Sequence, residues 1–254
     1  MRITIKIGSN VLTRKDGSLD VTRMSALVDQ IATLRADGHE IILVSSGAVA
    51  SGRSELKHIQ HDLDSVDQRQ LFSAVGQAKL INRYFELFRE YSIPVGQVLT
   101  TKENFSDSEH RKNQENCMRV MLENEVLPIV NENDTVSVTE LMFTDNDELS
   151  GLIAKMTNSQ MLIILSNIDG VFTGNPDNPE SRLISIVKPG KSLEDYIQAS
   201  KSSAGRGGMK STSSVAQQTA AAGISVIIAN GKRDDILVRL MNDRDNTPCT
   251  EFLC

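Results

Sequence analysis

Cysteine, histidine and aromatic residues are scarce in this 254-residue chain, and tryptophan is absent. The three cysteines, Cys117, Cys249 and Cys254, have no paired spacing, and the four histidines do not complete a cysteine–histidine metal framework. This usage favours a reducing, cytoplasmic compartment. Aromatic residues make up only 4% of the chain, which leaves little material for stacking nucleic-acid bases.

Long apolar runs and clusters of basic charge are also missing. No apolar run reaches the roughly 18 residues of a transmembrane helix, and the N-terminal residues do not resemble a secretory signal, so no membrane association is expected. The formal charge is −6, without a long run of lysine or arginine. This balance argues against nucleic acid as a partner, because such binding depends on neutralising phosphates.

The apolar residues alternate between the periodicities of strands and helices. Strands are expected at 2–7, 40–44, 95–99, 126–130, 161–165 and 224–229, and helices at 21–37, 67–91, 146–157, from about 209, and at 234–241. A further helix is expected to open at Ser106, with Glu109 as its capping-box partner, and residues 136–143 to form a hairpin. The alternation predicts a three-layer αβα sandwich with a mostly parallel central sheet, as one compact domain whose two lobes meet near residue 160. Ligands should bind at the carboxyl ends of the strands.

Lys6 lies inside the apolar run of the first expected strand. A buried ammonium group is costly unless it meets an anion, although a lysine at a strand edge can extend its amine to solvent. The neighbouring Gly8 would let the backbone approach a phosphate closely. We therefore expect Lys6 and Gly8 to contact a phosphate group.

Residues 47–54 differ at one position from the P-loop pattern, because Arg53 stands where that pattern has lysine. A P-loop nucleoside triphosphatase is nevertheless excluded. Ser166 and Asn167 follow the strand expected at 161–165, where such an enzyme has an acidic residue that holds Mg²⁺. Residues 45–47 instead predict a tight turn whose N–H groups face an anionic ligand.

Two clusters of short polar side chains indicate an amino-acid ligand. Residues 131–134, Asn-Glu-Asn-Asp, offer Asp134 for an ammonium group and amides for a carboxylate, although an Asx-rich turn has the same composition. Residues 145–147, Asp-Asn-Asp, precede an expected helix, and one of them should cap it. Asp147 is interpreted as a spare carboxylate that orients lysines.

The glycine-rich segment 205–209 opens another expected helix. Such a segment lets a phosphate approach a helix N-terminus, although it can also be a plain flexible connection. Arg206 and Lys210 favour a nucleotide as its ligand.

In their order along the chain, these segments resemble the amino acid kinase family and, within it, the glutamate 5-kinases (gamma-glutamyl kinases) of proline biosynthesis. The resemblance rests on residues 5–13, 44–52, 75–77, 130–134, 145–147 and 205–209, which span essentially the whole chain. It implies a kinase that uses ATP, with Mg²⁺ carried by the nucleotide, to phosphorylate the side-chain carboxylate of L-glutamate. It also implies one kinase domain over 1–254, with an amino-acid lobe at about 1–160, a nucleotide lobe at about 161–254 and no PUA domain.

The resemblance also implies a role for each matched residue. Lys6 would contact the transferred phosphoryl group, and Asp147 would organise the catalytic lysines. The residues expected to hold glutamate are Ser46, Gly47, Asn131, Asp134 and Asn146. Those expected to face ATP are Lys6, Gly8, Ser166, Asn167, Arg206, Gly207, Gly208, Met209 and Lys210. No residue is assigned as a metal ligand.

Two positions depart from the family pattern. Family members have a lysine three residues after the Gly-Gly-Met segment, where this chain has Thr212 and its nearest lysine is Lys210. On a regular helix these two positions lie about 200° apart, so Lys210 reaches the same phosphate only if the helix begins later or the loop rearranges. The family's aspartate in the nucleotide loop is Asn167 here.

Three functional hypotheses follow. Phosphorylation of glutamate needs no general base, because a carboxyl group with a pKa of about 4.3 is already ionised at neutral pH. The same fold could serve another acceptor, namely acetylglutamate, aspartate, carbamate or a nucleoside monophosphate. The Thr212 substitution also leaves open a sensor that binds amino acid or nucleotide without turnover. The resemblance further implies a dimer or tetramer built through the helices at 67–91 and 106–124.

Overall fold

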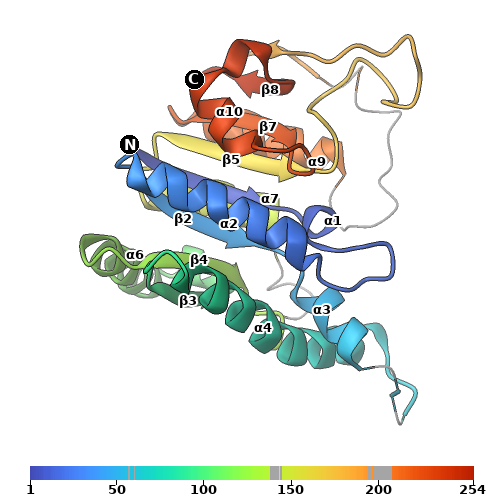
Figure 1. Cartoon of the computed structure of the whole chain (residues 1–254), viewed down its shortest axis with the longest axis vertical. Coiled ribbons are helices and arrows are strands. Elements are labelled where there is room, and N and C mark those ends of the chain that lie inside the picture. Colours follow the sequence, from blue (N-terminus) through green and yellow to red (C-terminus); the bar gives the residue numbers. More distant parts are fainter. Residues whose placement is uncertain (57, 60, 138–142, 144, 194–195, 197–207) are drawn as a thin grey trace.

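The computed structural model describes residues 1–254 except 57, 60, 138–142, 144, 194–195 and 197–207 (Figure 1). The strands are β1 (Arg2–Ile7), β2 (Glu40–Ser45), β3 (Val95–Thr100), β4 (Leu127–Glu132), β5 (Met161–Ser166), β6 (Ile186–Val187), β7 (Ser225–Asn230) and β8 (Cys249–Phe252). The α-helices are α1 (Ser9–Leu12), α2 (Val21–Ala36), α3 (Ala48–Glu55), α4 (Ser65–Arg89), α5 (Glu103–Ser106), α6 (Ser108–Glu123), α7 (Asn146–Met156), α9 (Met209–Ala220) and α10 (Ile236–Asn242). A short 3₁₀ turn, η2 (Arg244–Asn246), precedes β8.

The strands form one sheet in the order β3-β4-β2-β1-β5-β7-β8-β6. The first six of these strands are parallel, whereas β8 is antiparallel to β7 and β6 is parallel to β8. Strand β1 lies in the centre, with Lys6 opposite Val44 of β2 and Ile164 of β5. Because β4, β2, β1 and β5 are consecutive and parallel, the loops that follow them open at the same edge of the sheet.

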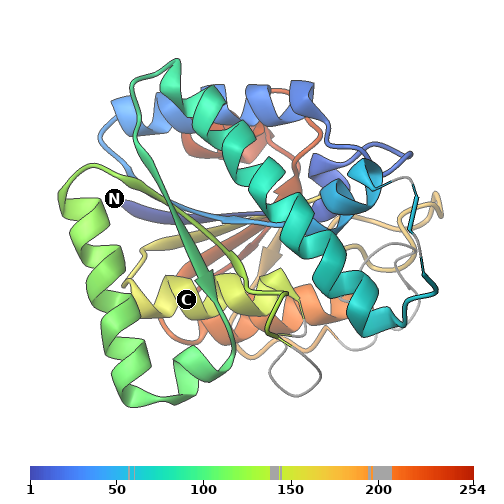
Figure 2. The ribbon, with the colours of Figure 1, turned by 90° about the horizontal axis from the view of Figure 1, so that it is seen from below.

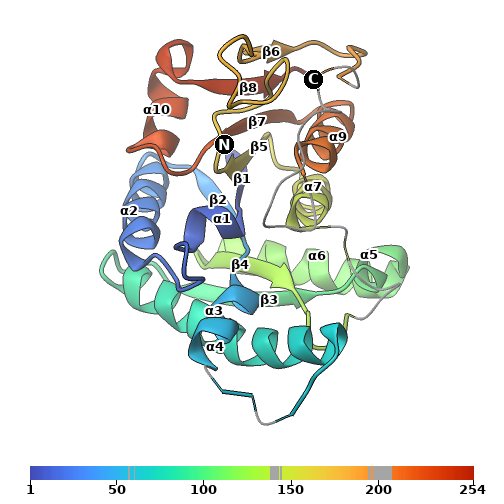
Figure 3. The same ribbon diagram turned by 90° about the vertical axis from the view of Figure 1, so that its right-hand side faces the viewer.

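Helices cover both faces of the sheet, so the expected three-layer αβα sandwich is confirmed (Figures 2 and 3). Helices α2, α4 and α10 pack on one face, and α6, α7 and α9 on the other. Side chains alternate along β1, so Ile5 and Ile7 enter the α2 side while Lys6 meets α7 on the opposite side. The two-residue period of the strand therefore directs the lysine away from the apolar core.

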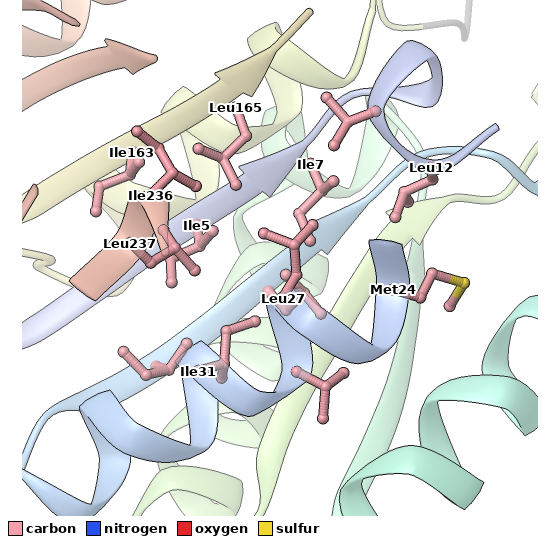
Figure 4. Packing of buried hydrophobic residues seen from close by; sticks show 14 of the residues in the cluster. Ile5, Ile7, Leu12, Met24, Leu27, Ile31, Ile163, Leu165, Ile236 and Leu237 are labelled. Atoms are coloured by element: carbon pink, nitrogen blue, oxygen red, sulfur yellow. The ribbon is translucent and has the colours of Figure 1, made fainter. Parts of the chain in front are cut away.

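The largest apolar cluster joins the sheet to α2 and α10 (Figure 4). Ile5 and Ile163 of neighbouring strands lie near Leu27 and Ile31 of α2 and near Leu237 of α10. Each of these side chains is fully buried, which stabilises the fold by about 1.5–3 kcal/mol per side chain. This packing makes the central strands a rigid support for the loops at their carboxyl ends.

Helices α3 and α4 cross at two glycines. A Cβ atom on Gly76 of α4 would lie 1.8 Å from the carbonyl oxygen of Ala48, and one on Gly52 of α3 would lie 1.8 Å from that of Phe72. Only glycine permits this backbone approach. The crossing fixes α4 beside the turn at 45–47 that begins α3.

One sequence expectation about the elements is wrong, one falls largely outside the described residues, and two short strands were not expected. Ser106 does not open a helix: it ends α5, and Asp107 caps α6 by accepting hydrogen bonds from the N–H groups of Glu109 and His110 at 2.9 and 2.8 Å. A carboxylate at this position also complements the helix dipole. The hairpin expected at 136–143 falls largely on residues outside those described. Strands β6 and β8 were not predicted, because one is two residues long and the other carries Thr250 and Glu251 instead of an apolar run.

Candidate active site

A cavity of about 970 Å³ lies where β1, β2, β4 and β5 end. It brings together most of the residues singled out from the sequence: Lys6, Gly8, Ser46, Gly47, Asn131, Asp134, Asn146, Asp147, Ser166, Asn167, Gly208 and Met209. Lys210 is exposed and does not line the cavity, whereas Thr212 does. Arg206 and Gly207 lie outside the described residues.

Lys6 and Asp147 form an ion pair inside this cavity. The Lys6 Nζ atom lies 2.5 Å from Asp147 Oδ1, and the two residues are only 9% and 5% exposed. A Cβ atom at Gly8 would lie 3.4 Å from the same Nζ, so the glycine leaves room for the amine. Because both charges are costly to desolvate, a buried pair of this kind is weak evidence for stability and points to a chemical role.

Asp147 also accepts a hydrogen bond from the first turn of α9. The hydroxyl of Thr212 donates to Asp147 Oδ2 at 2.5 Å. The carboxylate of Asp147 therefore joins β1, α7 and α9, with one oxygen beside a cation and the other beside a hydroxyl.

Asp145 is the cap expected for α7. It accepts hydrogen bonds from the N–H groups of Asp147 and Glu148 at 3.0 Å each, and the Ser211 hydroxyl donates to its Oδ2 at 2.7 Å. Burial raises the pKa of Asp145, the negative charge of Asp147 raises it further, and the Ser211 hydrogen bond opposes both. Asp145 and Asp147 thus tie the N-terminus of α7 to that of α9.

The amides of Asn131 and Asn146 form a continuous hydrogen-bonded cluster. Asn131 Nδ2 donates to Gln77 Oε1 at 2.8 Å, and Asn146 Nδ2 donates to Asn131 Oδ1 at 3.0 Å. Asn146 Nδ2 also donates to Ser46 Oγ at 2.9 Å. The cluster links α4 and α7 to the ends of β4 and β2.

Asp134 is paired with an arginine of α4. Arg69 Nε donates to Asp134 Oδ1 at 2.8 Å, and its Nη2 donates to Glu132 Oε2 at 2.7 Å. Glu132 Oε1 accepts from the backbone N–H of Phe143 at 3.1 Å. The cluster thus places two carboxylates around one guanidinium in the cavity lining.

The turns after β1 and β2 hold main-chain donors near the cavity. The N–H of Gly8 donates a hydrogen bond to the carbonyl oxygen of Leu165 at 3.0 Å. The main-chain donors left for a ligand after β1 are therefore the N–H groups of Ser9 and Asn10, which begin α1. Gly47 caps α3 with a φ of 105°, a conformation that favours glycine. Both helix starts line the cavity.

Ser166 shapes the loop that follows β5. Its hydroxyl donates to the carbonyl of Ile168 at 2.9 Å and accepts from the N–H of the same residue at 3.2 Å. Asn167 is exposed in this loop and lines the cavity. Ser166 therefore supports the shape of the loop, while Asn167 is the side chain available to a ligand.

A sequence profile of the amino acid kinase family matches residues 1–230. The chain belongs to the amino acid kinase family. It is 69% identical over 252 residues to a glutamate 5-kinase of Bacteroides thetaiotaomicron, covering 99% of this chain and 70% of that protein. It is 46% identical over 238 residues to a glutamate 5-kinase of Chlorobaculum tepidum, covering 93% of this chain and 65% of that protein. It covers 92% of a glutamate 5-kinase of Symbiobacterium thermophilum, which is 39% identical over 241 residues and matches 94% of this chain.

Solved structures share the fold of this amino acid kinase. An isopentenyl phosphate kinase superposes with a TM-score of 0.70 at 17% identity, covering 99% of this chain and all of the other. Carbamate kinase from Giardia lamblia, bound to AMP-PNP, superposes with a TM-score of 0.67 at 17% identity, covering 99% and 98%. At such low identity the likeness establishes the fold alone.

Sequence reasoning did not assign roles to three residues of this amino acid kinase site. Gln77 belongs to the 75–77 segment that carried the resemblance, and this was the one signal that could have found it. Glu132 belongs to the polar segment 131–134 that the sequence singled out, but nothing there pointed to its partner. Arg69 gave no local signal, because its pairing joins the start of α4 to the end of β4. Thr212 drew attention only as a missing lysine, whereas the structure gives it a direct contact with Asp147.

Among the described residues, no three His, Cys, Asp or Glu side chains gather as a metal-binding group. None of the described helices combines the length and apolarity needed to cross a membrane.

Proposed function

We propose that this amino acid kinase transfers the γ-phosphoryl group of ATP to the side-chain carboxylate of L-glutamate, which gives L-glutamyl 5-phosphate and ADP. This reaction is the first step of proline biosynthesis. The observation that carries the proposal is the position of Lys6. Its buried amine lies in one cavity with the amide cluster of Asn131 and Asn146 and with the loop at 166–167.

The acceptor would bind at the groups supplied by residues 1–160. The carboxylate of Asp134, which lines the cavity, complements the α-ammonium group of glutamate, and Ser46 and Asn131 have hydrogen-bond donors for a carboxylate. ATP would lie on the side formed by residues 161–254, against Asn167, Gly208 and Met209 at the start of α9. Mg²⁺ would arrive on the nucleotide and neutralise part of its phosphate charge.

In the transfer step, an oxygen of the acceptor carboxylate attacks the γ-phosphorus, and the bond to the bridging oxygen of ADP breaks. The carboxylate is already ionised at neutral pH, so no proton has to be removed. The barrier arises from bringing two anions together. Lys6 would reduce this repulsion beside the transferred group, with the N–H groups that begin α1 and α3 as further donors.

Acyl phosphate formation tests the proposal directly. The chain is incubated with ATP, Mg²⁺ and hydroxylamine, and hydroxamate is measured for glutamate, acetylglutamate and aspartate. Carbamate and a nucleoside monophosphate are scored by ADP release. Glutamate should be the preferred acceptor, and glutarate, which lacks the ammonium group, should bind severely more weakly. Preference for another acceptor, or binding of glutamate and ATP without hydroxamate, would overturn the proposal.

We further propose that copies of this chain associate through α4 and α6. Leu71 and Phe85 of α4 and Val120 of α6 are exposed apolar side chains, which supports a contact along these helices. Light scattering should give a multiple of 27.9 kDa, and Phe85→Asp should lower it. A mass of one chain for the wild type would contradict the association.

We also propose that the chain acts in the cytoplasm. Cys117 and Cys254 are exposed free thiols, which is typical of a reducing compartment. Fractionation of the source cells tests this location, and recovery of the protein outside the cytoplasm would contradict it.

A further inference from the structure

Gln77 does not line the cavity but contacts a side chain that does. It lies half-buried on α4, next to Gly76, where α4 meets the backbone of α3. Its Oε1 accepts the hydrogen bond from Asn131 Nδ2 at 2.8 Å. Because the glycine crossing fixes this part of α4, the acceptor oxygen of Gln77 has a defined position relative to the site.

One backbone donor decides how every amide in the cluster is turned. The N–H of Glu132 can only donate, and it donates to Asn131 Oδ1 at 2.9 Å. Asn131 must therefore present its oxygen to Glu132 and Asn146, and its Nδ2 to Gln77. Gln77 in turn has to present an oxygen, and Asn146 has to present its Nδ2.

This order leaves a particular atom of Asn146 for the ligand. Its Nδ2 is engaged by Asn131 Oδ1 at 3.0 Å and Ser46 Oγ at 2.9 Å. Its Oδ1 makes no hydrogen bond to any residue within the described part of the chain, and Asn146 lines the cavity. A free amide oxygen accepts hydrogen bonds, so it matches an ammonium group and not a carboxylate.

We propose that Gln77 is a positioning residue that makes the site specific for an acceptor with an α-ammonium group. Its oxygen stabilises the Asn131 amide in the orientation that the Glu132 N–H sets, and Asn131 then holds Asn146 with its own oxygen directed to the acceptor. The inference rests on the proposed use of glutamate. It adds a residue outside the cavity that helps to keep an acceptor atom of Asn146 facing the ligand.

The variants are chosen to change the acceptor atom with little change of shape. Gln77→Met has a similar length and no strong acceptor, so the Glu132 N–H alone is left to hold the Asn131 amide, which should turn over more readily. Gln77→Glu supplies only acceptor oxygens and should preserve their order. Asn82→Met is the matched control, because it removes an exposed amide from the same helix, where the Asn82 amide donates to Glu86 on the surface.

For each variant, KM and kcat are measured with glutamate and ATP, together with the inhibition constant of glutarate. Gln77→Met should raise KM for glutamate about tenfold or more, since a hydrogen bond to a charged group is lost. Its KM for ATP and its inhibition by glutarate should stay within about twofold of the wild type. Gln77→Glu should remain within about threefold of the wild-type KM for glutamate, and Asn82→Met should match the wild type.

The outcomes separate this inference from the proposed function. If Gln77→Met weakens the binding of glutamate and of glutarate equally, the role of Gln77 is overturned. The same holds if Gln77→Met and Gln77→Glu raise KM for glutamate equally. Either result leaves the proposed kinase reaction intact. Thermal unfolding of each variant identifies any loss of folding, which would weaken ATP binding as well. A wild-type chain that forms no hydroxamate from glutamate overturns the proposed function itself.

Discussion

Thr212 donates a 2.5 Å hydrogen bond to Asp147 Oδ2, on the carboxylate whose Oδ1 lies 2.5 Å from Lys6 Nζ. The hydroxyl occupies the position at which the family resemblance led us to expect a lysine. Lys210 is exposed and outside the cavity lining, so it does not take over that place in this structure. Within the described part of the chain, Lys6 is the lysine that faces the cavity.

The contact predicts the effect of removing the Thr212 hydroxyl. Thr212→Val keeps the shape of the side chain but leaves a buried carboxylate oxygen without its donor. The free energy of unfolding should fall by about 1–3 kcal/mol, and kcat should fall because Asp147 no longer holds its orientation. Thr212→Ser keeps the hydroxyl, so its free energy of unfolding and its kcat should stay close to those of the wild type. Chemical denaturation and hydroxamate kinetics measure them, and a valine variant as active as the serine variant would contradict the assigned contact.

Lys6 should matter for turnover far more than for glutamate binding. Lys6→Ala removes the buried amine beside the transferred phosphoryl group, so kcat should fall about 10²–10³-fold or more. The Kd for glutamate, measured by calorimetry, should change little, because the acceptor groups lie on β2, β4 and α7. Lys79→Ala is the control, since Lys79 forms an exposed ion pair with Glu55 on the surface. Near-normal turnover in Lys6→Ala would refute the assignment.

Asp145 should make stability fall as the pH rises. Its pKa in the folded chain is raised from 3.8 by burial and by Asp147, so between 3.8 and that higher value the folded state holds more protons than the unfolded state. Stability therefore decreases with rising pH across this window and stays lowered above it. Asp145→Asn removes the charge and keeps a capping oxygen. It should be more stable than the wild type at pH 7, with the difference shrinking on acidification.

Asp107 provides a control of opposite sign for that experiment. Its pKa is lowered from 3.8, mainly by the backbone hydrogen bond from His110, so its contribution to stability is present at neutral pH and lost as the pH falls below 3.8. Asp107→Asn should therefore be less stable than the wild type at pH 7. Denaturant unfolding from pH 3 to pH 7 compares the two variants. If both substitutions change the free energy of unfolding at pH 7 in the same direction, the opposite pKa shifts assigned to Asp145 and Asp107 are wrong.

Gly76 should not tolerate a larger side chain. A Cβ atom at this position would lie 1.8 Å from the carbonyl oxygen of Ala48, so Gly76→Ala must separate α4 from α3. The loss of stability should reach or exceed the about 1–3 kcal/mol that overpacking commonly costs. Urea denaturation measures it, with Ala78→Ser at an exposed position of the same helix as the control. An alanine variant as stable as this control would show that the crossing can relax.

Much of the architecture followed from local patterns in the sequence. Short apolar or alternating segments identified the six parallel strands, and helical spacing identified α2, α4, α7 and α9 to within a few residues. The polar segments after the strands of this α/β fold were then expected at one edge of the sheet. Lys6, Asn131 and Asp147 meet in one cavity for that reason.

The rest depended on contacts between segments distant in the chain. The sequence alone did not reveal that Arg69 pairs with Asp134, that Gln77 accepts a hydrogen bond from the Asn131 amide, or that Thr212 reaches Asp147. Nor did it reveal β6 and β8, whose few residues become strands by pairing at the edge of the sheet. Backbone periodicity is a local property and can be read from neighbouring residues. The partner of a polar side chain is decided by helix crossing and strand order, which exist only once the chain has folded.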